Sequence, residues 1–410
     1  MRLGGGRKGR FALAAVTSLA TVSAFTLAGL PARATGLTAS IGSQPVQAPL
    51  NVNGRHVFWP SNVNTGSATV SPSTYNNLIY HGGAVETAPK VYVVFWGSEW
   101  DNTAGPSYNI PATNPGTGAD YTLGELQNYI TTFFSGVGTT PSGTPTPPAG
   151  TGPGTTGAGW NNIQTQYCQG GTIGDVTCGA GTTPVTNPSA VLGGTWVDDT
   201  PADAPPQVIA TLGLAENLNV ALDPVAAEAV RAANKFGITG DPNATVFVYA
   251  PPGRDVTGFY PVPYYCGYHT EVQPSNLTNS ATGLRYAFIP YLLDIDLNST
   301  YAAVGSCGMN YVNKVNDSAG HGVFDGFSIV SGHEYAEAVT DPDNWPPNVQ
   351  DGWNDYQTSE NGDKCAWMAP GSGTGAATNM FTATTGQYFA VQGLWSNAAS
   401  GGTGGCAVTY

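Results

Sequence analysis

The chain has 410 residues, of which only 10% are charged, and its 27 Asp and Glu outnumber its 13 Lys and Arg to give a formal net charge of −14. Such an acidic surface repels a phosphate backbone, so nucleic acid is not an expected partner. The 55 Gly and 31 Pro, with polarity supplied by Ser, Thr and Asn, are typical of an extracellular protein that is rich in loops.

Residues 1–34 predict an export signal. A basic front that includes Arg2 and Arg10 precedes an apolar run over 11–30, and the triplet 32–34 is a small-x-small cleavage site. A membrane anchor is the alternative, because the apolar run is near the lower length limit for a span. The signal holds five basic residues and no acidic ones, so without it the net charge is −19. No later segment is apolar enough to predict a membrane span in the mature chain.

The next segment, residues 35–75, is polar and has little periodicity. It predicts an extended N-terminal arm that leads to a single globular domain over 76–410. The ordered structure of the domain is expected to begin at Tyr80. The run 90–97 is apolar throughout and is bounded by a proline and a glycine, which predicts a strand covered on both faces.

Large apolar residues recur at helical spacing over 121–134 and predict an amphipathic helix. A Gly, Thr and Pro tract follows at 136–159 and lacks the large apolar side chains that an ordered segment would bury. We interpret this tract as a flexible surface loop, with a domain linker as the alternative.

Further helices and strands alternate in the second half of the chain. The segment 224–236 has an aspartate N-cap and a terminating glycine, which predict a helix, and 244–251 and 286–292 predict buried strands. A motif-bearing helix is expected at about 327–340. The alternation predicts an α/β or α+β fold, in one domain with a mixed sheet, a central motif helix and long Gly/Pro-rich loops, for which a zincin-like arrangement is one form.

All six cysteines follow the export signal. An even number of cysteines in an exported chain predicts three disulfides. The simplest pairing is sequential and joins Cys168 to Cys178, Cys266 to Cys307, and Cys365 to Cys406. A cysteine metal site is the alternative, and the lack of any C-x-x-C pair disfavours it.

The most informative segment is 331–342. On a helix His333 and Glu337 share one face, one turn apart, and Glu334 lies beside them, about 100° round the axis. Zinc proteases carry H-E-x-x-H here, with the outer residues binding the metal and the inner glutamate accepting a proton from water. We therefore predict His333 and Glu337 as metal ligands and Glu334 as the general base, with a glutamate in place of the second histidine.

A third ligand has to come from another part of the chain. The sequence after the motif offers Asp355, Glu360 and Asp363 in loop-like surroundings, and we rank Glu360 and Asp363 first, ahead of His321 and Asp341. Zinc is the expected ion. Because the second motif ligand is a carboxylate, the site also suits harder ions such as Mn, Fe or Ca.

The alternative to a metal site is a chance pattern on a solvated helix face. The apolar sequence around the motif argues against it, because a buried charge cluster is costly unless it is paired or metal-bound. With only five histidines in the chain, one inside such a cluster is notable. His269 lies in an aromatic segment whose side chains are expected to pack together. The alternative is a role for His269 in the site. His81 is expected to be a turn residue. The sequence contains no G-x-S-x-G elbow, so it does not support a nucleophilic triad.

Four motifs in order resemble the extracellular EXORDIUM-like, phosphate-induced protein family of plants and its bacterial relatives. They are Y-H-G-G-A-V at 80–85 leading into K-V-Y-V-V-F-W-G at 90–97, Y-C-G-Y-H at 265–269, S-G-H-E-Y-A-E at 331–337 with T-D-P after it, and E-N-G-D-K-C at 360–365. They span roughly residues 80 to 366. The order of the four motifs is far more specific than any one of them.

The resemblance implies a secreted or wall-associated protein, similar to ones linked to cell growth in plants. It also directs attention to five positions, His333, Glu334, Glu337, Glu360 and Asp363. The chain differs from the family pattern in having a glycine between the motif serine and His333.

Two functions are expected. The first is a secreted metal-dependent hydrolase, in its narrower form a zincin-like peptidase, acting on a peptide or a cell-wall polymer. The second is a non-catalytic extracellular or cell-wall-associated binding protein in which the cluster is a structural ion site or a buried ion pair. The sequence leaves open the substrate, the identity of the ion and whether one binds, the third metal ligand, the disulfide connectivity and the oligomeric state.

Overall fold

The structure is a computed structural model. It describes residues 46–47, 51–52, 55–64, 77–101, 109–114, 116–141, 154–209, 223–256, 264–277, 282–298, 305–314, 321–343, 350–382 and 387–410. The predicted export signal, residues 1–34, lies outside the described residues.

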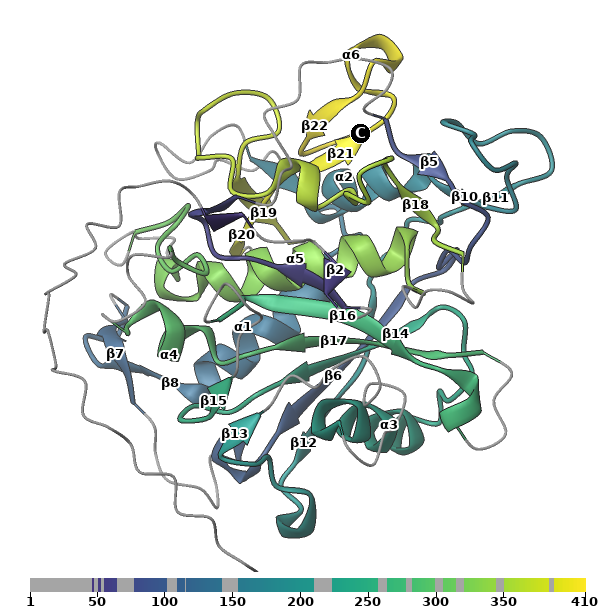
Figure 1. Ribbon diagram of the computed structural model, residues 1–410. Helices are drawn as coiled ribbons and strands as arrows, with labels where there is room; N and C mark the ends of the chain where they lie inside the picture. The colour runs from purple at the N-terminus through teal and green to yellow at the C-terminus, as the bar shows by residue number, and fades with distance from the viewer. Residues whose placement is uncertain are drawn as a thin grey trace, which may run out of the picture. The chain divides into compact units, whose positions relative to one another are not determined.

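A seven-stranded mixed sheet with the order β12-β6-β14-β17-β16-β3-β2 forms the main framework (Figure 1). The first four strands are parallel, and β16, β3 and β2 are each antiparallel to the strand before them. In chain order the strands are β2 (Asn51–Val52), β3 (Arg55–Phe58), β6 (Lys90–Trp96), β12 (Leu192–Asp198), β14 (Ala244–Tyr249), β16 (Gly267–Val272) and β17 (Leu284–Ile289). The mixed α/β class predicted from the sequence is therefore confirmed.

Helices α1 (Leu123–Gly136) and α5 (Asp325–Thr340) cover one face of this sheet, and α3 (Pro224–Phe236) covers the other. The described residues also form the short helices α2 (Gly157–Asn161), α4 (Leu292–Asp296) and α6 (Ala399–Gly402). The 3₁₀ turns are η2 (Ser98–Trp100), η3 (Asn162–Gln166), η4 (Pro201–Asp203), η5 (Pro274–Asn276), η6 (Gly322–Phe324) and η7 (Asp363–Cys365). In β6, Val93 and Phe95 belong to the core that includes α1 and α5, whereas Val94 and Trp96 belong to the core that includes α3. This alternation is expected of a strand buried on both faces.

Short two- and three-stranded sheets complete the fold. They are β1 (Val46–Gln47) with β4 (Val63–Asn64), β5 (Ile79–Tyr80) with β18 (Trp353–Asn354), β7 (Asn109–Thr113) with β8 (Asp120–Thr122), β10 (Cys168–Gln169) with β11 (Thr183–Pro184), β13 (Val208–Ile209) with β15 (Asp255–Val256), β9 (Thr155–Thr156) with β19 (Thr378–Phe381) and β20 (Tyr388–Val391), and β21 (Leu394–Ser396) with β22 (Gly405–Ala407).

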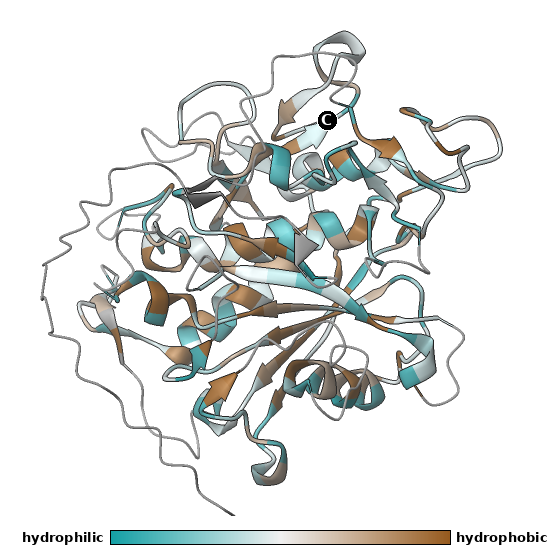
Figure 2. Cartoon of the chain, viewed as in Figure 1, coloured by the Kyte–Doolittle hydropathy of each residue, from teal (hydrophilic) through white to brown (hydrophobic). Residues whose placement is uncertain are grey.

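Helix α5 lies between two β layers. It contacts β16 and β17 of the main sheet on one side and β20 on the other, and all sixteen of its residues are buried. A helix enclosed on all sides is normally apolar all round. Figure 2 nevertheless shows hydrophilic segments along α5, whose sequence includes the polar residues of the predicted motif. Their burial needs a chemical reason.

The helix that the sequence predicts best is α3. The side chain of Asp223 accepts hydrogen bonds from the backbone N–H groups of Val225 and Ala226, and Gly237 ends the helix with φ of 71°. This is the expected N-cap and left-handed terminator. By contrast, the strand predicted at 286–292 is wrong at its end, because β17 stops before Pro290, which has no N–H for the ladder, and α4 follows.

The sequence also missed order in two places. Strand β3, which falls within the predicted N-terminal arm, pairs with β16 in the main sheet, and its four residues are buried. Order therefore begins before Tyr80. In the tract 136–159, residues 142–153 lie outside the described residues, but its end forms β9 and the start of α2, with Trp160 of α2 fully buried. Both segments are too short to show a period in the sequence.

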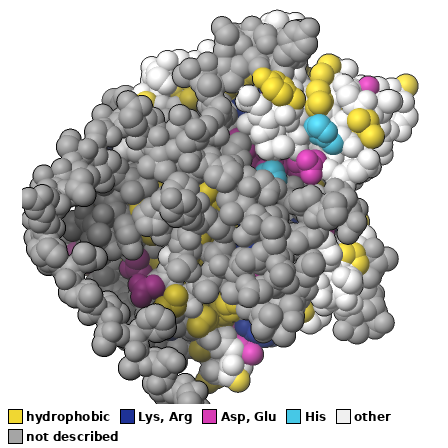
Figure 3. Space-filling model, viewed as in Figure 1, with side chains coloured by type: hydrophobic (Ala, Val, Ile, Leu, Met, Phe, Trp, Pro, Cys, Tyr) yellow, Lys and Arg dark blue, Asp and Glu magenta, His cyan; other side chains and the backbone are white. Residues whose placement is uncertain are grey.

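The predicted sequential disulfides are all present, Cys168–Cys178, Cys266–Cys307 and Cys365–Cys406. Three disulfides are compatible with an oxidising extracellular compartment. A search of the described residues finds no helix with the length and apolar character needed to cross a membrane. On the face in Figure 3, Lys and Arg side chains occupy only small areas of the described surface, as the acidic composition leads one to expect.

Candidate metal centre

The motif residues of α5 lie as the helical spacing predicts. His333 Nε2 is 3.0 Å from Glu337 Oε1, one turn further along the helix. Neither side chain is more than 1% exposed. The helix therefore places an imidazole and a carboxylate side by side in the protein interior.

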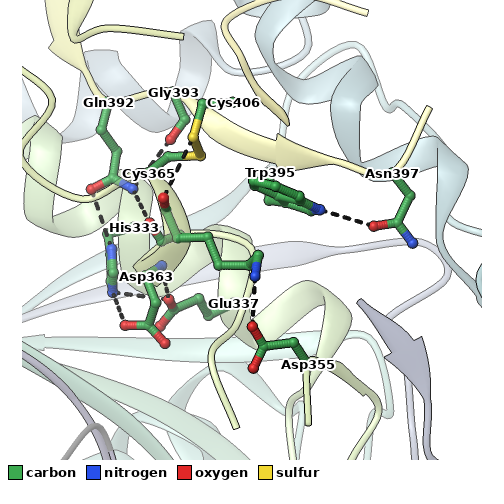
Figure 4. The surroundings of a disulfide bond; sticks show 12 residues. His333, Glu337, Asp355, Asp363, Cys365, Gln392, Gly393, Trp395, Asn397 and Cys406 are labelled. Carbon is green, nitrogen blue, oxygen red and sulfur yellow. Dashed lines mark hydrogen bonds and ion pairs between the residues drawn. A yellow bond between two sulfur atoms is a disulfide. The ribbon is translucent and has the colours of Figure 1, made fainter. Parts of the chain in front are cut away.

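Asp363 joins this pair from η7, as Figure 4 shows. Its Oδ1 lies 3.9 Å from His333 Nε2, and its backbone N–H donates to Glu337 Oε1 over 2.9 Å. The Cys365–Cys406 disulfide ties η7 to β22. Gly362 allows the close approach, because a Cβ there would lie 2.7 Å from Glu337 Oε1.

Gln392 sets the orientation of the His333 ring. Its amide nitrogen donates to the carbonyl of Gly362 over 2.8 Å, so its Oε1 faces His333 Nδ1 at 3.2 Å as an acceptor. His333 then carries its proton on Nδ1, and the lone pair of Nε2 points toward Glu337 and Asp363. Nε2 makes no hydrogen bond despite its burial. A buried imidazole nitrogen without a hydrogen-bond donor thus lies beside two carboxyl groups, which is an arrangement that suits a cation.

Two histidines outside the motif helix complete the cluster. His269 on β16 and His56 on β3 are directly opposed in the antiparallel pairing, with ring centroids 5.2 Å apart. His269 Nδ1 lies 3.1 Å from Glu334 Oε2, and its Nε2 lies 3.7 Å from Glu360 Oε1. His56 Nδ1 contacts Glu360 Oε2. Cross-strand neighbours on one face of a sheet are expected to meet in this way.

We call this set the His–carboxylate cluster. Its seven members are buried and come from β3, β16, α5 and the segment that leads into η7; they are His56, His269, His333, Glu334, Glu337, Glu360 and Asp363. Three groups within it, each with ligand atoms within 4.8 Å of one another, have the composition of a metal site: His333, Glu337 and Asp363; His269, Glu334 and Glu337; and His56, His269 and Glu360.

Close packing holds the cluster together. Phe58 of β3 stacks on the His333 ring with a centroid distance of 3.7 Å, and Trp367 stacks on Phe58 at 4.9 Å. Gly267 of β16 lets α5 approach the sheet, because a Cβ there would lie 2.7 Å from Glu334 Oε1. The two β strands therefore fix the histidines against the helix.

Burial dominates the electrostatics of the cluster. It raises the pKa of all four carboxyl groups well above the ordinary value, and in three of them the neighbouring charge of Glu337 adds to the effect. Burial also lowers the pKa of His56 to about 3 and that of His333 to about 4. The pKa of His269 falls well below its ordinary value for the same reason, with a hydrogen bond to the Asp341 carbonyl acting in the opposite direction. Neutral imidazoles are the form that binds metals.

The sequence-predicted residues divide into two groups. His333, Glu334, Glu337, Glu360 and Asp363 are brought together in the cluster.

The lower-ranked candidates Asp341, Asp355 and His321 have other partners. Asp341 accepts from Gly352 N at 2.6 Å, and Asp355 pairs with Lys364 Nζ at 2.6 Å. The His321 ring packs against aromatic rings that include Phe324.

His56 is the residue that sequence reasoning missed, because its strand was interpreted as an arm. His269 was considered, but a packed aromatic segment was preferred. The low histidine count was the available signal, since three of only five histidines in the chain lie in the cluster. Comparison with known proteins adds no assignment, because no family model, curated protein or solved structure matches this chain.

Proposed function

We propose that the protein is a secreted metal-dependent hydrolase that binds a divalent ion, zinc first, through His333, Glu337 and Asp363. The observation that carries this proposal is the convergence of His333 Nε2, Glu337 Oε1 and Asp363 Oδ1 in a buried site, where Nε2 makes no hydrogen bond. One imidazole and two carboxylates are a suitable set for Zn or Mn, and the two carboxylates also admit Ca.

The residues of the chain would divide the chemistry between them. A divalent ion, when bound, supplies polarisation of a substrate carbonyl. Glu334 would accept the proton of the attacking water, because it is adjacent to the ligands on α5 and its Oε1 makes no hydrogen bond. His269 would hold the other oxygen of Glu334 in place across 3.1 Å. A peptide is the narrower proposal for the substrate, on the strength of the H-E-x-x-E pattern, and a cell-wall polymer is the wider one.

The test is to measure metal content and hydrolysis of a peptide library with the same preparation of purified mature protein. We expect a bound divalent ion, and we expect Glu334→Gln to lower hydrolysis by about 10²–10⁴-fold while the metal content stays unchanged. Glu228→Gln is the matched control, because Glu228 is a buried glutamate on α3, away from α5. A protein without bound metal, or a fully active Glu334→Gln variant, would end the proposal.

A structural ion site in a non-catalytic extracellular binding protein is the second candidate. It is favoured by the enclosure of the cluster, in which no residue is more than 7% exposed. Removal of the ion should then destabilise the fold, by about 2.7 kcal/mol if the free ion had been at 100 times its Kd. The two functions differ in one measurement, since only the hydrolase shows peptide cleavage that depends on Glu334.

A further inference from the structure

A single metal ion would not use all the metal-binding side chains of the His–carboxylate cluster. With His333, Glu337 and Asp363 as its ligands and Glu334 as the base, two imidazoles and one carboxylate are left, those of His56, His269 and Glu360. Hydrolysis at one ion needs none of the three. Burying three ionisable groups without a function for them is costly, so their presence calls for an explanation.

The three remaining residues themselves have the composition of a metal site. Each offers one ligand atom, these atoms lie within 4.8 Å of one another, and the set shares no residue with the first. His56 Nδ1 and both carboxylate oxygens of Glu360 are buried and make no hydrogen bond, although His56 and Glu360 are in contact. Acceptor atoms of His56 and Glu360 therefore converge where no hydrogen-bond donor satisfies them.

His269 is held in a way that suits a ligand. Its Nδ1 is 3.1 Å from Glu334 Oε2, and its Nε2 is 3.7 Å from Glu360 Oε1. A carboxylate on one ring nitrogen is the common means of orienting a metal-binding histidine, whose other nitrogen then binds the ion. Glu334 would thus connect the two sets, as the base for one and the orienting group for the other.

The charge of the cluster supports the same conclusion. It contains four carboxyl groups, and no described lysine or arginine is among the charged groups that act on them. If all four carboxyl groups ionise when metal binds, one divalent ion would offset two of the negative charges, whereas two divalent ions would offset all four. Uncompensated charge is costly in an interior of low polarity.

We propose that the cluster holds two divalent ions, the second on His56, His269 and Glu360. Two histidines and one carboxylate suit a transition ion such as Zn or Mn. The inference deepens the proposed function, because the second ion lies in the same site. It also makes β3, from the segment before residue 75, a part of the metal centre.

The test counts ions rather than turnover. The purified mature protein is stripped with a chelator, reloaded with excess Zn²⁺, freed of unbound metal by gel filtration, and analysed for zinc per chain. We expect two ions in the native protein and one in His56→Gln and in Glu360→Gln, with folding checked by circular dichroism. His321→Gln, which alters a histidine outside the cluster, is the matched control and should retain two. Anomalous diffraction from zinc would place each ion.

The possible outcomes are distinct. A single ion in the native protein, or two ions retained in both His56→Gln and Glu360→Gln, would overturn the second site. A protein with two ions and no hydrolytic activity would contradict the hydrolase but support the second site. An active protein with one ion would support the hydrolase but contradict the second site. If His56→Gln fails to fold, the zinc content of Glu360→Gln decides whether the second site exists. That substitution changes a single atom, and the Glu360 carboxylate accepts no hydrogen bond that could be lost.

Discussion

Two buried acidic clusters lie next to each other in this molecule and differ in one respect. Strand β16 contributes His269 to the His–carboxylate cluster and, two residues later on the same face, Glu271 to a second group. We call the second group the arginine cluster; it consists of Glu86, Glu271, Arg285 and Asp343.

The arginine cluster contains its own cation. Arg285 binds both carboxylate oxygens of Asp343, with Nε to Oδ1 at 2.6 Å and Nη2 to Oδ2 at 2.9 Å. Its Nη1 donates to the carbonyl of Pro242, and Glu86 accepts from the Thr245 hydroxyl. Such bidentate pairing is a strong form of charge-assisted hydrogen bond.

The comparison teaches how to interpret buried acidic groups. Where the chain supplies a guanidinium, Asp343 is held in an ion pair, and the charge of Arg285 opposes the rise in the pKa of Glu86 and Glu271. Where it supplies only neutral imidazoles, as at His333, the proposed metal ion would supply the positive charge. Imidazoles and carboxylates without a cationic side chain are therefore a stronger indication of a metal site than burial alone.

The largest effect should come from breaking the arginine cluster. Arg285→Met leaves the Asp343 carboxylate without its partner, and removing one partner of a buried pair costs about 3–5 kcal/mol. We expect this loss in the free energy of unfolding, measured by urea denaturation, with or without added zinc. Lys235→Met on the exposed face of α3 is the control and should change stability by less than about 1 kcal/mol. If excess zinc restored the stability of Arg285→Met, the two clusters would not be separate.

A smaller effect should sharpen the metal side of the comparison. Gln392→Leu removes the acceptor that orients His333 Nδ1 and should weaken zinc binding by about 10–100-fold, as expected for a residue that orients a ligand. The measurement is a competition titration with a chromogenic chelator. Gln166→Leu is the matched control, since Gln166 bonds to Ser396 outside the cluster. Equal zinc affinities in the two variants would show that Gln392 has no such role.

The smallest effect concerns pH and the arginine cluster. Burial raises the pKa of Glu86 to about 8, partly opposed by Arg285. The folded state therefore holds a proton that the unfolded state has lost, and stability should fall as pH rises from about 5 through 8. Glu86→Gln has no such proton to lose, so it should reduce the slope of this dependence by up to about 1.4 kcal/mol per pH unit. Parallel profiles of unfolding free energy for the two proteins between pH 5 and 9 would contradict this expectation.

Five of the seven residues of the candidate site could be predicted because their signals are local. His333, Glu334 and Glu337 are related by helical spacing, and Asp363 and Glu360 lie a short distance further along the chain. His56 could not be predicted, because it comes from a four-residue strand whose partner is more than two hundred positions away in the sequence. The strand has no periodicity of its own to reveal it.

The sequence by itself determined the class of fold, the helices with strong caps and the helix face that carries His333 and Glu337, since each depends on neighbouring residues or on composition. Only the tertiary structure decided that this face is enclosed between two β layers, and that His56 and His269 oppose each other across β3 and β16. The physical reason is that strand pairing and burial are set by contacts between distant segments, and such contacts leave no spacing in the chain from which they could be predicted.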